Sequence, residues 1–515
     1  MKTTSRKLAV AWPLVIFLLL PALARAETAV QAWVQRYNRL GNSDDRAYAV
    51  AVDGNNDVIV TGFSGQGPGS ADYVTIKYSS GGVPLWTNYY NGPGNDNDEA
   101  TAVAVDGSNN VVVTGYSLGN GSSDDYATIK YSGAGVPLWT NRYNGPGNGA
   151  DVATAVAVDG SNNVIVTGYS TGSGSGYDYA TIEYSSAGVP LWTNRYPNGS
   201  SYALAVDGSN NVIVTGTSGG GYATIKYSSA GVLLWINRYN GPGGNDYANA
   251  VAVDGSNNVV VTGWSTGSGS YSDYATIKYS SAGMPLWTNR YHGPGNYYDS
   301  ATAMAVDGSN NVIVTGTSYD TESSEDYATL KYSSDGAPLW TNRYNGPVGY
   351  DNYARAMAVD GSNNVIVTGQ SLGAVGYYDY ATIKYSSAGV PLWTNRYNGP
   401  GNNIDTANAV AVDRSGNVIV TGQSTGSGSG YDFATVKYVC VVPSPVVTGL
   451  QLTNGTFQMR VDDVLQACTV VIEACTNLAG WAPVFTNTTP TNVLFYTDPD
   501  AGNYPWRFYR AFQSP

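Results

Sequence analysis

Short apolar runs, some alternating and some continuous, repeat along most of the chain with polar turns between them. In one unit, an Ala/Val run at 153–158 ends at Asp159, a Gly-Ser-Asn-Asn turn follows, and Val-Ile-Val-Thr-Gly occupies 164–168. Two more runs of β-forming residues follow at 178–184 and 190–196. Runs of this length separated by Gly, Ser and Asn predict four β-strands joined by turns. Nothing of helical period and length intervenes.

Copies of this unit follow one another at intervals of 47 to 53 residues. Four antiparallel strands in about 50 residues are the pattern of a β-propeller blade. We therefore predict an all-β protein in which residues 27–441 form an eight-bladed propeller of four-stranded antiparallel blades. The Asp that ends the first run marks the eight copies: Asp53, Asp106, Asp159, Asp207, Asp254, Asp307, Asp360 and Asp413.

The two ends of the array predict a closed ring. Trp33 lies in a strand of the fourth type that has no blade before it. The eighth copy stops at Tyr438, after its third strand. We expect the N-terminal strand around Trp33 to complete the last blade, which leaves no terminal sheet edge exposed.

The connections between strands fall into two kinds. Those between the first and second strands, and between the third and fourth, are short and nearly the same in every copy. The other connections are long and variable, so we expect any recognition site on the face that bears them. The fourth copy differs because both of its long connections, 217–222 and 197–201, are shortened. This predicts either a notch that admits a ligand or a neutral deletion.

The repeat resembles a bacterial family named for its β-propeller repeat (SBBP, "seven-bladed β-propeller"). The similarity rests on the A-x-A-V-D-G-x-x-N-V-x-V-T-G segment, the D-Y-A-T-I-K-Y strand and G-V-P-L-W. The resemblance implies a propeller fold and a secreted or cell-surface setting, without a shared chemistry. The family name says seven blades, whereas the copies here number eight.

Composition and charge exclude one class of partner. Charged residues make up 12% of the chain and the net charge is −13. A nucleic-acid partner needs a basic footprint, which this chain lacks. An extracellular glycan or protein is compatible with such a surface, and the sequence carries no signal for an oligomeric state.

Residues 1–26 predict a secretory signal, with a basic start, an apolar run at 8–20 and an Ala-Arg-Ala cleavage site. The alternative is an N-terminal membrane anchor, for which the apolar run is short. We expect no membrane span after cleavage.

Residues 442–446 predict a stiff Pro-containing linker, and 447–515 a small β-rich module that resembles sandwich-like modules appended to secreted bacterial repeat proteins. The three cysteines, Cys440, Cys468 and Cys475, leave one thiol over, and their pairing is open.

Two residue classes in the long loops are candidates for a site. Aromatic rings near Asn and Asp suit sugars or peptides, although packing of the loops onto the blades is the alternative. The candidate ligand-binding rings are Tyr177, Trp264, Tyr271, Tyr297, Tyr298, Tyr319 and Tyr378. An Asp also precedes the third strand in seven copies, where it serves either as a Ca²⁺ ligand or as an acceptor for backbone N–H groups in a turn. These residues are Asp72, Asp125, Asp178, Asp273, Asp326, Asp379 and Asp432.

We predict no catalytic residues and no cofactor, with Ca²⁺ at the Asp row as the alternative. His292, the single histidine, stands where other copies have Asn, and a substitution explains it better than a catalytic base. The sequence therefore favours a secreted or cell-surface, non-catalytic binding or scaffold protein that holds a glycan, peptide or matrix polymer. The alternative is a polysaccharide hydrolase or lyase with loop carboxylates on the same face.

Overall fold

The computed structural model describes most of the chain: residues 28–39, 43–65, 70–174, 176–268, 271–295, 297–321, 324–441, 446–453, 456–462, 469–476, 480–487, 493–503 and 507–514. The predicted signal segment, most of the predicted linker and Cys468 lie outside these residues. None of the helical structure in the described part has the length and apolar composition needed to cross a membrane.

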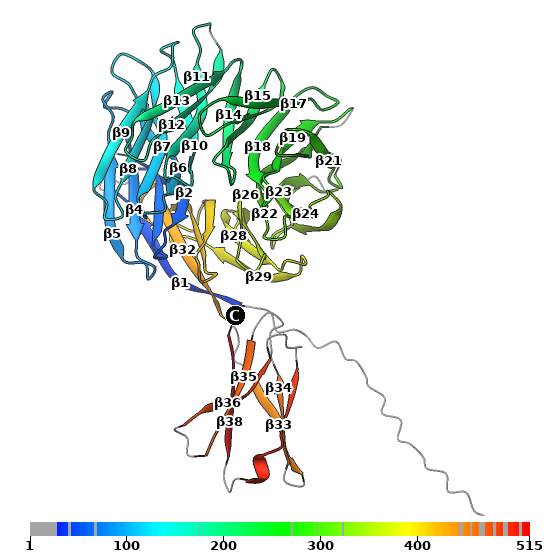
Figure 1. Ribbon diagram of the computed structural model, residues 1–515. Coiled ribbons are helices and arrows are strands. Elements are labelled where there is room, and N and C mark those ends of the chain that lie inside the picture. The colour runs from blue at the N-terminus through cyan, green and yellow to red at the C-terminus, as the bar shows by residue number, and fades with distance from the viewer. Residues whose placement is uncertain are drawn as a thin grey trace, which may run out of the picture. The chain divides into compact units, whose positions relative to one another are not determined.

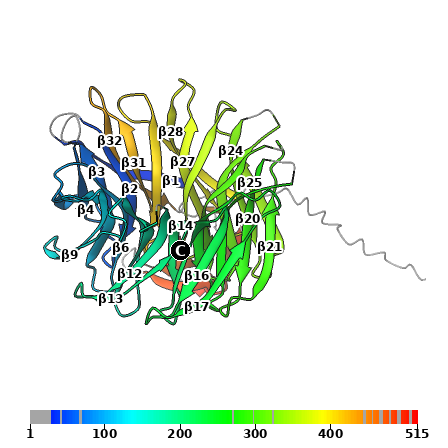
Figure 2. The ribbon, with the colours of Figure 1, turned by 90° about the horizontal axis from the view of Figure 1, so that it is seen from above.

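Eight four-stranded antiparallel sheets make up the described part of the unit Ala29–Cys440, and they succeed one another around a ring in chain order (Figures 1 and 2). The innermost strands are β2 (Asp45–Val52), β6 (Asp98–Val105), β10 (Asp151–Val158), β14 (Gly199–Val206), β18 (Asp246–Val253), β22 (Asp299–Val306), β26 (Asn352–Val359) and β30 (Asp405–Val412). The second strands are β3 (Val58–Gly65), β7 (Val111–Leu118), β11 (Val164–Thr171), β15 (Val212–Ser218), β19 (Val259–Thr266), β23 (Val312–Tyr319), β27 (Val365–Leu372) and β31 (Val418–Thr425).

The third and fourth strands take the two outer positions of each blade, and each fourth strand contains one Trp. The third strands are β4 (Ala71–Tyr78), β8 (Asp124–Tyr131), β12 (Tyr177–Tyr184), β16 (Gly221–Tyr227), β20 (Ser272–Tyr279), β24 (Glu325–Tyr332), β28 (Tyr378–Tyr385) and β32 (Tyr431–Val441). The fourth strands are β5 (Pro84–Tyr90), β9 (Pro137–Tyr143), β13 (Pro190–Tyr196), β17 (Leu233–Tyr239), β21 (Pro285–Tyr291), β25 (Pro338–Tyr344), β29 (Pro391–Tyr397) and, in the last blade, β1 (Thr28–Tyr37). The predicted all-β propeller is confirmed.

The last blade combines both ends of the array. Its sheet has the order β1-β32-β31-β30, so the N-terminal strand takes the outermost place. Arg36 of β1 donates to Asp432 at 2.7 Å. Across the seam to the first blade, Phe433 and Ile419 pack with Val58 and other core residues of that blade. These contacts fit the ring closure that the unpaired Trp33 strand predicts.

Neighbouring blades are joined by apolar packing and by repeated polar contacts. A buried Tyr in the third strand donates its hydroxyl to a main-chain carbonyl of the next blade, as Tyr73 does to Ala127 at 3.1 Å. Seven of the eight outer Trp indoles donate to a carbonyl in the next blade's turn, and Trp393 is the exception. In the turn that Trp86 contacts, Gly135 has φ +84° and an added Cβ would lie 2.7 Å from the Trp86 ring. This Ser-x-x-Gly turn therefore needs glycine at its last position, because an L side chain there would be strained and would also clash.

A β-bulge in each innermost strand sets the geometry of the inner rim. In the third blade, Ala153 pairs with Gly168 and Ala155 with Thr167, which leaves Thr154 unpaired in the ladder. The Thr154 hydroxyl instead donates to the Ser201 carbonyl of the next blade at 3.0 Å. Such a bulge re-aims a side chain, here toward the neighbouring blade.

The segment from Val441 onward is a second compact unit. One sheet has the order β33 (Val446–Thr453), β34 (Thr456–Asp462), β37 (Leu494–Asp498), and the other β36 (Ala482–Asn487), β35 (Thr469–Cys475), β38 (Phe508–Ser514). A short 3₁₀ helix occupies Ala501–Asn503. Met459, Val461, Val470 and Ile472 are buried between the strands and form its core.

Candidate functional site

The face with the short turns is held by buried ion pairs that repeat from blade to blade. In the second blade, Lys130 lies 2.8 Å from Asp106 and donates to the Ser186 carbonyl of the next blade. Seven blades share this Lys–Asp pair, so it belongs to the scaffold. The third blade has Glu183 in place of the lysine, 2% exposed, and burial followed by repulsion from Asp159 raises the pKa of Glu183.

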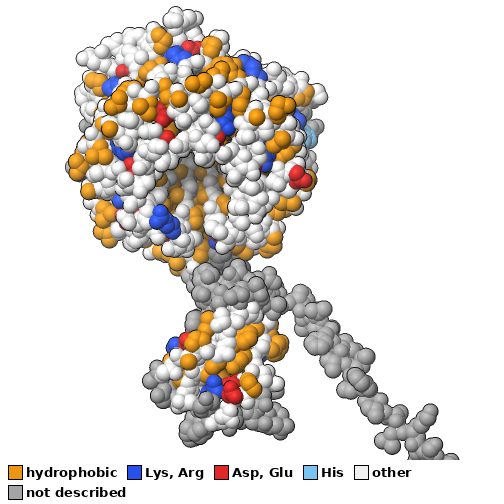
Figure 3. Space-filling view, in the orientation of Figure 1, with side chains coloured by type: hydrophobic (Ala, Val, Ile, Leu, Met, Phe, Trp, Pro, Cys, Tyr) orange, Lys and Arg blue, Asp and Glu red, His pale blue; other side chains and the backbone are white. Residues whose placement is uncertain are grey.

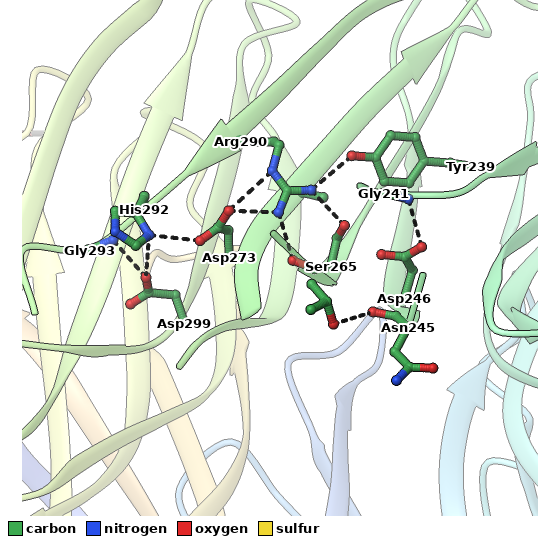
Figure 4. A network of polar contacts seen from close by, with 12 residues as sticks. Tyr239, Gly241, Asn245, Asp246, Ser265, Asp273, Arg290, His292, Gly293 and Asp299 are labelled. Atoms are coloured by element: carbon green, nitrogen blue, oxygen red, sulfur yellow. Dashed lines mark hydrogen bonds and ion pairs between the residues drawn. The ribbon is translucent and has the colours of Figure 1, made fainter. Parts of the chain in front are cut away.

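On the long-loop face, each Asp of the proposed calcium row has an arginine partner. In most blades the Arg comes from the fourth strand. Arg290, for example, lies 2.6 Å from Asp273 and also donates to Ser265 and to Tyr239 of the previous blade (Figure 4). The first blade has Tyr89 at the equivalent position, and Arg39 pairs with Asp72 instead. The pairs are Arg36–Asp432, Arg39–Asp72, Arg142–Asp125, Arg195–Asp178, Arg290–Asp273, Arg343–Asp326 and Arg396–Asp379, at 2.6 to 2.9 Å.

These pairs favour a structural role for the Asp row. A guanidinium already neutralises the carboxylate charge that a Ca²⁺ ion would require. A second Asp, at the start of the innermost strand, accepts a loop N–H, as Asp98 does from Gly92 at 2.6 Å. Burial raises the pKa of the Asp98 carboxyl, and the hydrogen bonds from Ser117 and Gly92 oppose this shift.

The shortened loops of the fourth blade border a pocket of about 340 Å³. Tyr177 of the third blade and Tyr247 of the fifth contribute aromatic walls, and Asn198 contributes an amide. No charged side chain is among the lining residues: Gly176, Tyr177, Asn198, Gly199, Ser200, Thr217, Ser218, Gly219, Gly220 and Tyr247. The predicted notch therefore coincides with an uncharged pocket of aromatic, hydroxyl and amide groups.

Stacked aromatic rings continue from the pocket onto the fifth blade. The Tyr247 ring lies 4.5 Å from that of Trp264 with an interplanar angle of 20°, and these residues pair across β18 and β19. On the opposite wall, Tyr177 is 47% exposed and packs edge-on against Tyr169 at 4.8 Å. The structure thus places Tyr177 in the pocket and Trp264 beside it, behind Tyr247.

A second aromatic group lies where the loops between the fifth and sixth blades meet the end of β23. Tyr271 stacks on Tyr297 at 4.2 Å and lies 4.6 Å from Tyr298, while Tyr319 lies 5.1 Å from Tyr297. Tyr271, Tyr297 and Tyr298 are each between 41% and 51% exposed. Four of the seven predicted rings therefore meet in one cluster, and Tyr378 lies apart, 6.0 Å from Tyr353.

Several residues of the inner rim, which the innermost strands form, are not among the candidates that the sequence predicts. The bulged position holds Thr or Asn in five blades, which donate to the next blade, but Tyr48, Tyr202 and Arg355 in the others. Two positions earlier, the strand carries side chains as different as Glu99 and Tyr247. The sequence feature that could have identified these residues is variation at two fixed positions of an otherwise repeated strand.

Two glutamates near the long loops, Glu99 of the innermost strand β6 and Glu325 of the third strand β24, have raised pKa values, which suits proton transfer. Burial raises the pKa of Glu99, against hydrogen bonds from the Tyr116 and Tyr48 hydroxyls. Burial likewise raises the pKa of Glu325, which contacts Tyr353 and Tyr319, and repulsion from Asp351 adds to the shift. These glutamates are the described carboxylates that best fit the alternative catalytic hypothesis.

The charged surface is sparse, as the composition predicts. In the space-filling view, charged side chains are few on the visible face of the propeller unit, and this face is hollowed (Figure 3).

No protein-family model and no curated protein sequence matches the chain. Among solved structures, the chain is similar to the Dos1 propeller, with a TM-score of 0.50 and 10% identity over 78% of this chain and 95% of that chain. A eukaryotic initiation factor gives a TM-score of 0.41 at 8% identity, over 70% and 80% of the two chains. A protein of unknown function from Dyadobacter fermentans gives 0.36 at 9%, over 80% and 99%. The first likeness shows the β-propeller fold, and the other two carry no further argument.

Proposed function

We propose that this protein is a secreted or cell-surface, non-catalytic binding protein that holds a neutral glycan on its long-loop face. The observation that carries the proposal is the uncharged pocket of the fourth blade. Its volume of about 340 Å³ falls within the usual range of ligand sites. Tyr177 and Tyr247 offer rings for stacking on sugar faces, and Asn198, Ser200 and Thr217 offer hydroxyl and amide partners.

The chemistry of the pocket favours a glycan over a charged peptide. A charged ligand would lose its hydration without gaining an ion pair, because no lining side chain is charged. The Tyr247–Trp264 stack extends the aromatic surface, which suits a polymer longer than one sugar. The setting outside the cell rests on the signal-like residues 1–26, and membership of the SBBP family rests on the repeat motif.

A glycan array followed by calorimetry tests the proposal. We expect Tyr177→Ala and Tyr247→Ala each to weaken binding by about tenfold, equivalent to about 1.4 kcal/mol. Tyr350→Ala is the matched control, because Tyr350 is 63% exposed and does not line the pocket. Binding that both pocket variants retain at wild-type strength contradicts the proposal.

A hydrolase or lyase is the second candidate, favoured by the half-buried Glu325, whose pKa repulsion from Asp351 helps to raise. Turnover of a polysaccharide that Glu325→Gln abolishes, with the folding of the variant intact, would replace the binding proposal.

A further inference from the structure

His292 departs from the repeat at a position where two carboxylates converge. The residue after the fourth strand is Asn in six copies and Pro in one, and Asn91, for example, bonds with Asn95 in its own loop. His292 instead places its imidazole Nδ1 2.8 Å from Asp273 Oδ1 and 4.0 Å from Asp299 Oδ2 (Figure 4). A ligand atom of each of the three residues lies within 4.8 Å of those of the other two.

This spacing suits a tetrahedral metal ion. Bonds of about 2.0–2.2 Å to nitrogen and oxygen separate neighbouring ligand atoms by about 3.4 Å. The two distances from Nδ1 bracket that value, so a small pivot of the imidazole equalises them. The side chain of His292 is 43% exposed, which leaves room for the pivot and for solvent as a further ligand.

Groups behind the carboxylates hold them in place. Arg290 contacts the other oxygen of Asp273, Oδ2, at 2.6 Å, and the Gly293 N–H donates to Asp299 Oδ2 at 2.6 Å. Such outer contacts orient metal ligands in proteins.

We propose that Asp273, His292 and Asp299 form a binding site for a divalent transition-metal ion of the Zn²⁺ type. The imidazole nitrogen distinguishes this site from the Asp row in the other blades, because Ca²⁺ and Mg²⁺ prefer oxygen ligands throughout. The site joins the loop that contains Tyr297 and Tyr298 to the fifth blade. A bound ion therefore holds the tyrosine cluster against the fifth blade.

The test is calorimetric titration of the full, untagged chain with Zn²⁺ and with Co²⁺ after chelator treatment. We expect one bound ion per chain, and Co²⁺ absorption bands of a nitrogen- and oxygen-ligated ion. His292→Asn introduces the residue that six sister copies have at this position, so we expect the variant to fold. We expect it to weaken metal binding by more than about 100-fold. Because His292 is the only histidine, no other imidazole competes.

A transplant completes the test. Asn398 precedes Asp405 by the spacing that separates His292 from Asp299, and Asp379 takes the place of Asp273. In the His292→Asn background, Asn398→His restores one ion per chain if the three side chains suffice. The assignment is overturned if the wild type binds neither ion, if His292→Asn binds as the wild type does, or if the transplant does not restore binding.

Discussion

Replacing Glu183 with lysine restores to the third blade an interaction that seven sister blades have. In those blades the Lys ammonium is 2–5% exposed and lies 2.7–3.0 Å from an Asp carboxylate. In the third blade, burial and repulsion from Asp159 raise the pKa of Glu183, and hydrogen bonds from Trp192 and Asn163 oppose this shift. The new ammonium would also reach the Ser229 carbonyl of the next blade. This carbonyl accepts from the Trp192 indole, so it corresponds to the carbonyl that the lysine and Trp share in the sister blades.

The expected gain follows from the cost of an unbalanced buried charge. Removing one partner of a buried ion pair costs about 3–5 kcal/mol, and a hydrogen bond to a charged group contributes about 1.5–3 kcal/mol. Because Glu183 already has two donors, we expect Glu183→Lys to stabilise the protein by about 2–4 kcal/mol. For a propeller of this size the melting temperature then rises by about 2–5 °C.

Urea unfolding and thermal melts of three variants measure the effect. Glu183→Gln removes the charge without adding a cation and should gain about 1 kcal/mol. Lys130→Glu copies the third blade's arrangement into the second and should lose about 3–5 kcal/mol. A Glu183→Lys protein that is no more stable than the wild type would refute the reasoning, provided that Lys130→Glu folds and is measurable.

The pH dependence supplies an independent check. The folded pKa of Glu183 lies above its ordinary value of 4.5, so the folded state binds this proton more tightly than the unfolded state does. Its stabilising contribution is complete below 4.5 and is lost as the pH rises through the raised pKa. The advantage of Glu183→Gln over the wild type should therefore be greatest near neutrality and shrink as the pH falls toward 4.5.

Three further predictions concern the ring. Arg343→Met should cost about 3–5 kcal/mol in urea unfolding, because it leaves the buried Asp326 without its 2.8 Å partner, whereas a cost below about 1 kcal/mol contradicts a structural role. Removal of residues 28–37 should expose the edge of β32 and produce aggregation in light scattering, and a monodisperse monomer argues against the role of β1 in the last blade. Ca²⁺ and a Ca²⁺-selective chelator should leave the melting temperature unchanged, because each Asp of the row faces an arginine, and a clear rise with Ca²⁺ restores the calcium hypothesis.

Strand positions and blade order followed from the sequence because hairpin turns and strand length are local properties. The Arg–Asp pairs were also accessible in principle, since Asp125 and Arg142 are 17 residues apart and this spacing recurs. The partner of Asp432 was not, because Arg36 lies 396 residues away and reaches it only through the last blade.

The candidate site was predictable in part. Shortened loops pointed to the fourth blade, where the pocket lies, and Tyr177 lines it. Tyr247 was missed because it sits within a strand rather than a loop, and only the cross-strand register places it beside Trp264. Whether an exposed ring meets a ligand or another ring depends on contacts between blades, as Tyr271 and Tyr297 illustrate.

The central claim is that the shortened loops of the fourth blade create the binding site. Its most direct test replaces Gly219–Gly221 with the equivalent, longer segment of the third blade, 171–178, and measures glycan affinity by calorimetry alongside the melting temperature. Our account predicts that this graft abolishes binding while the melting temperature stays within about 2 °C of the wild type. Glycan binding at wild-type affinity by the folded graft would contradict it.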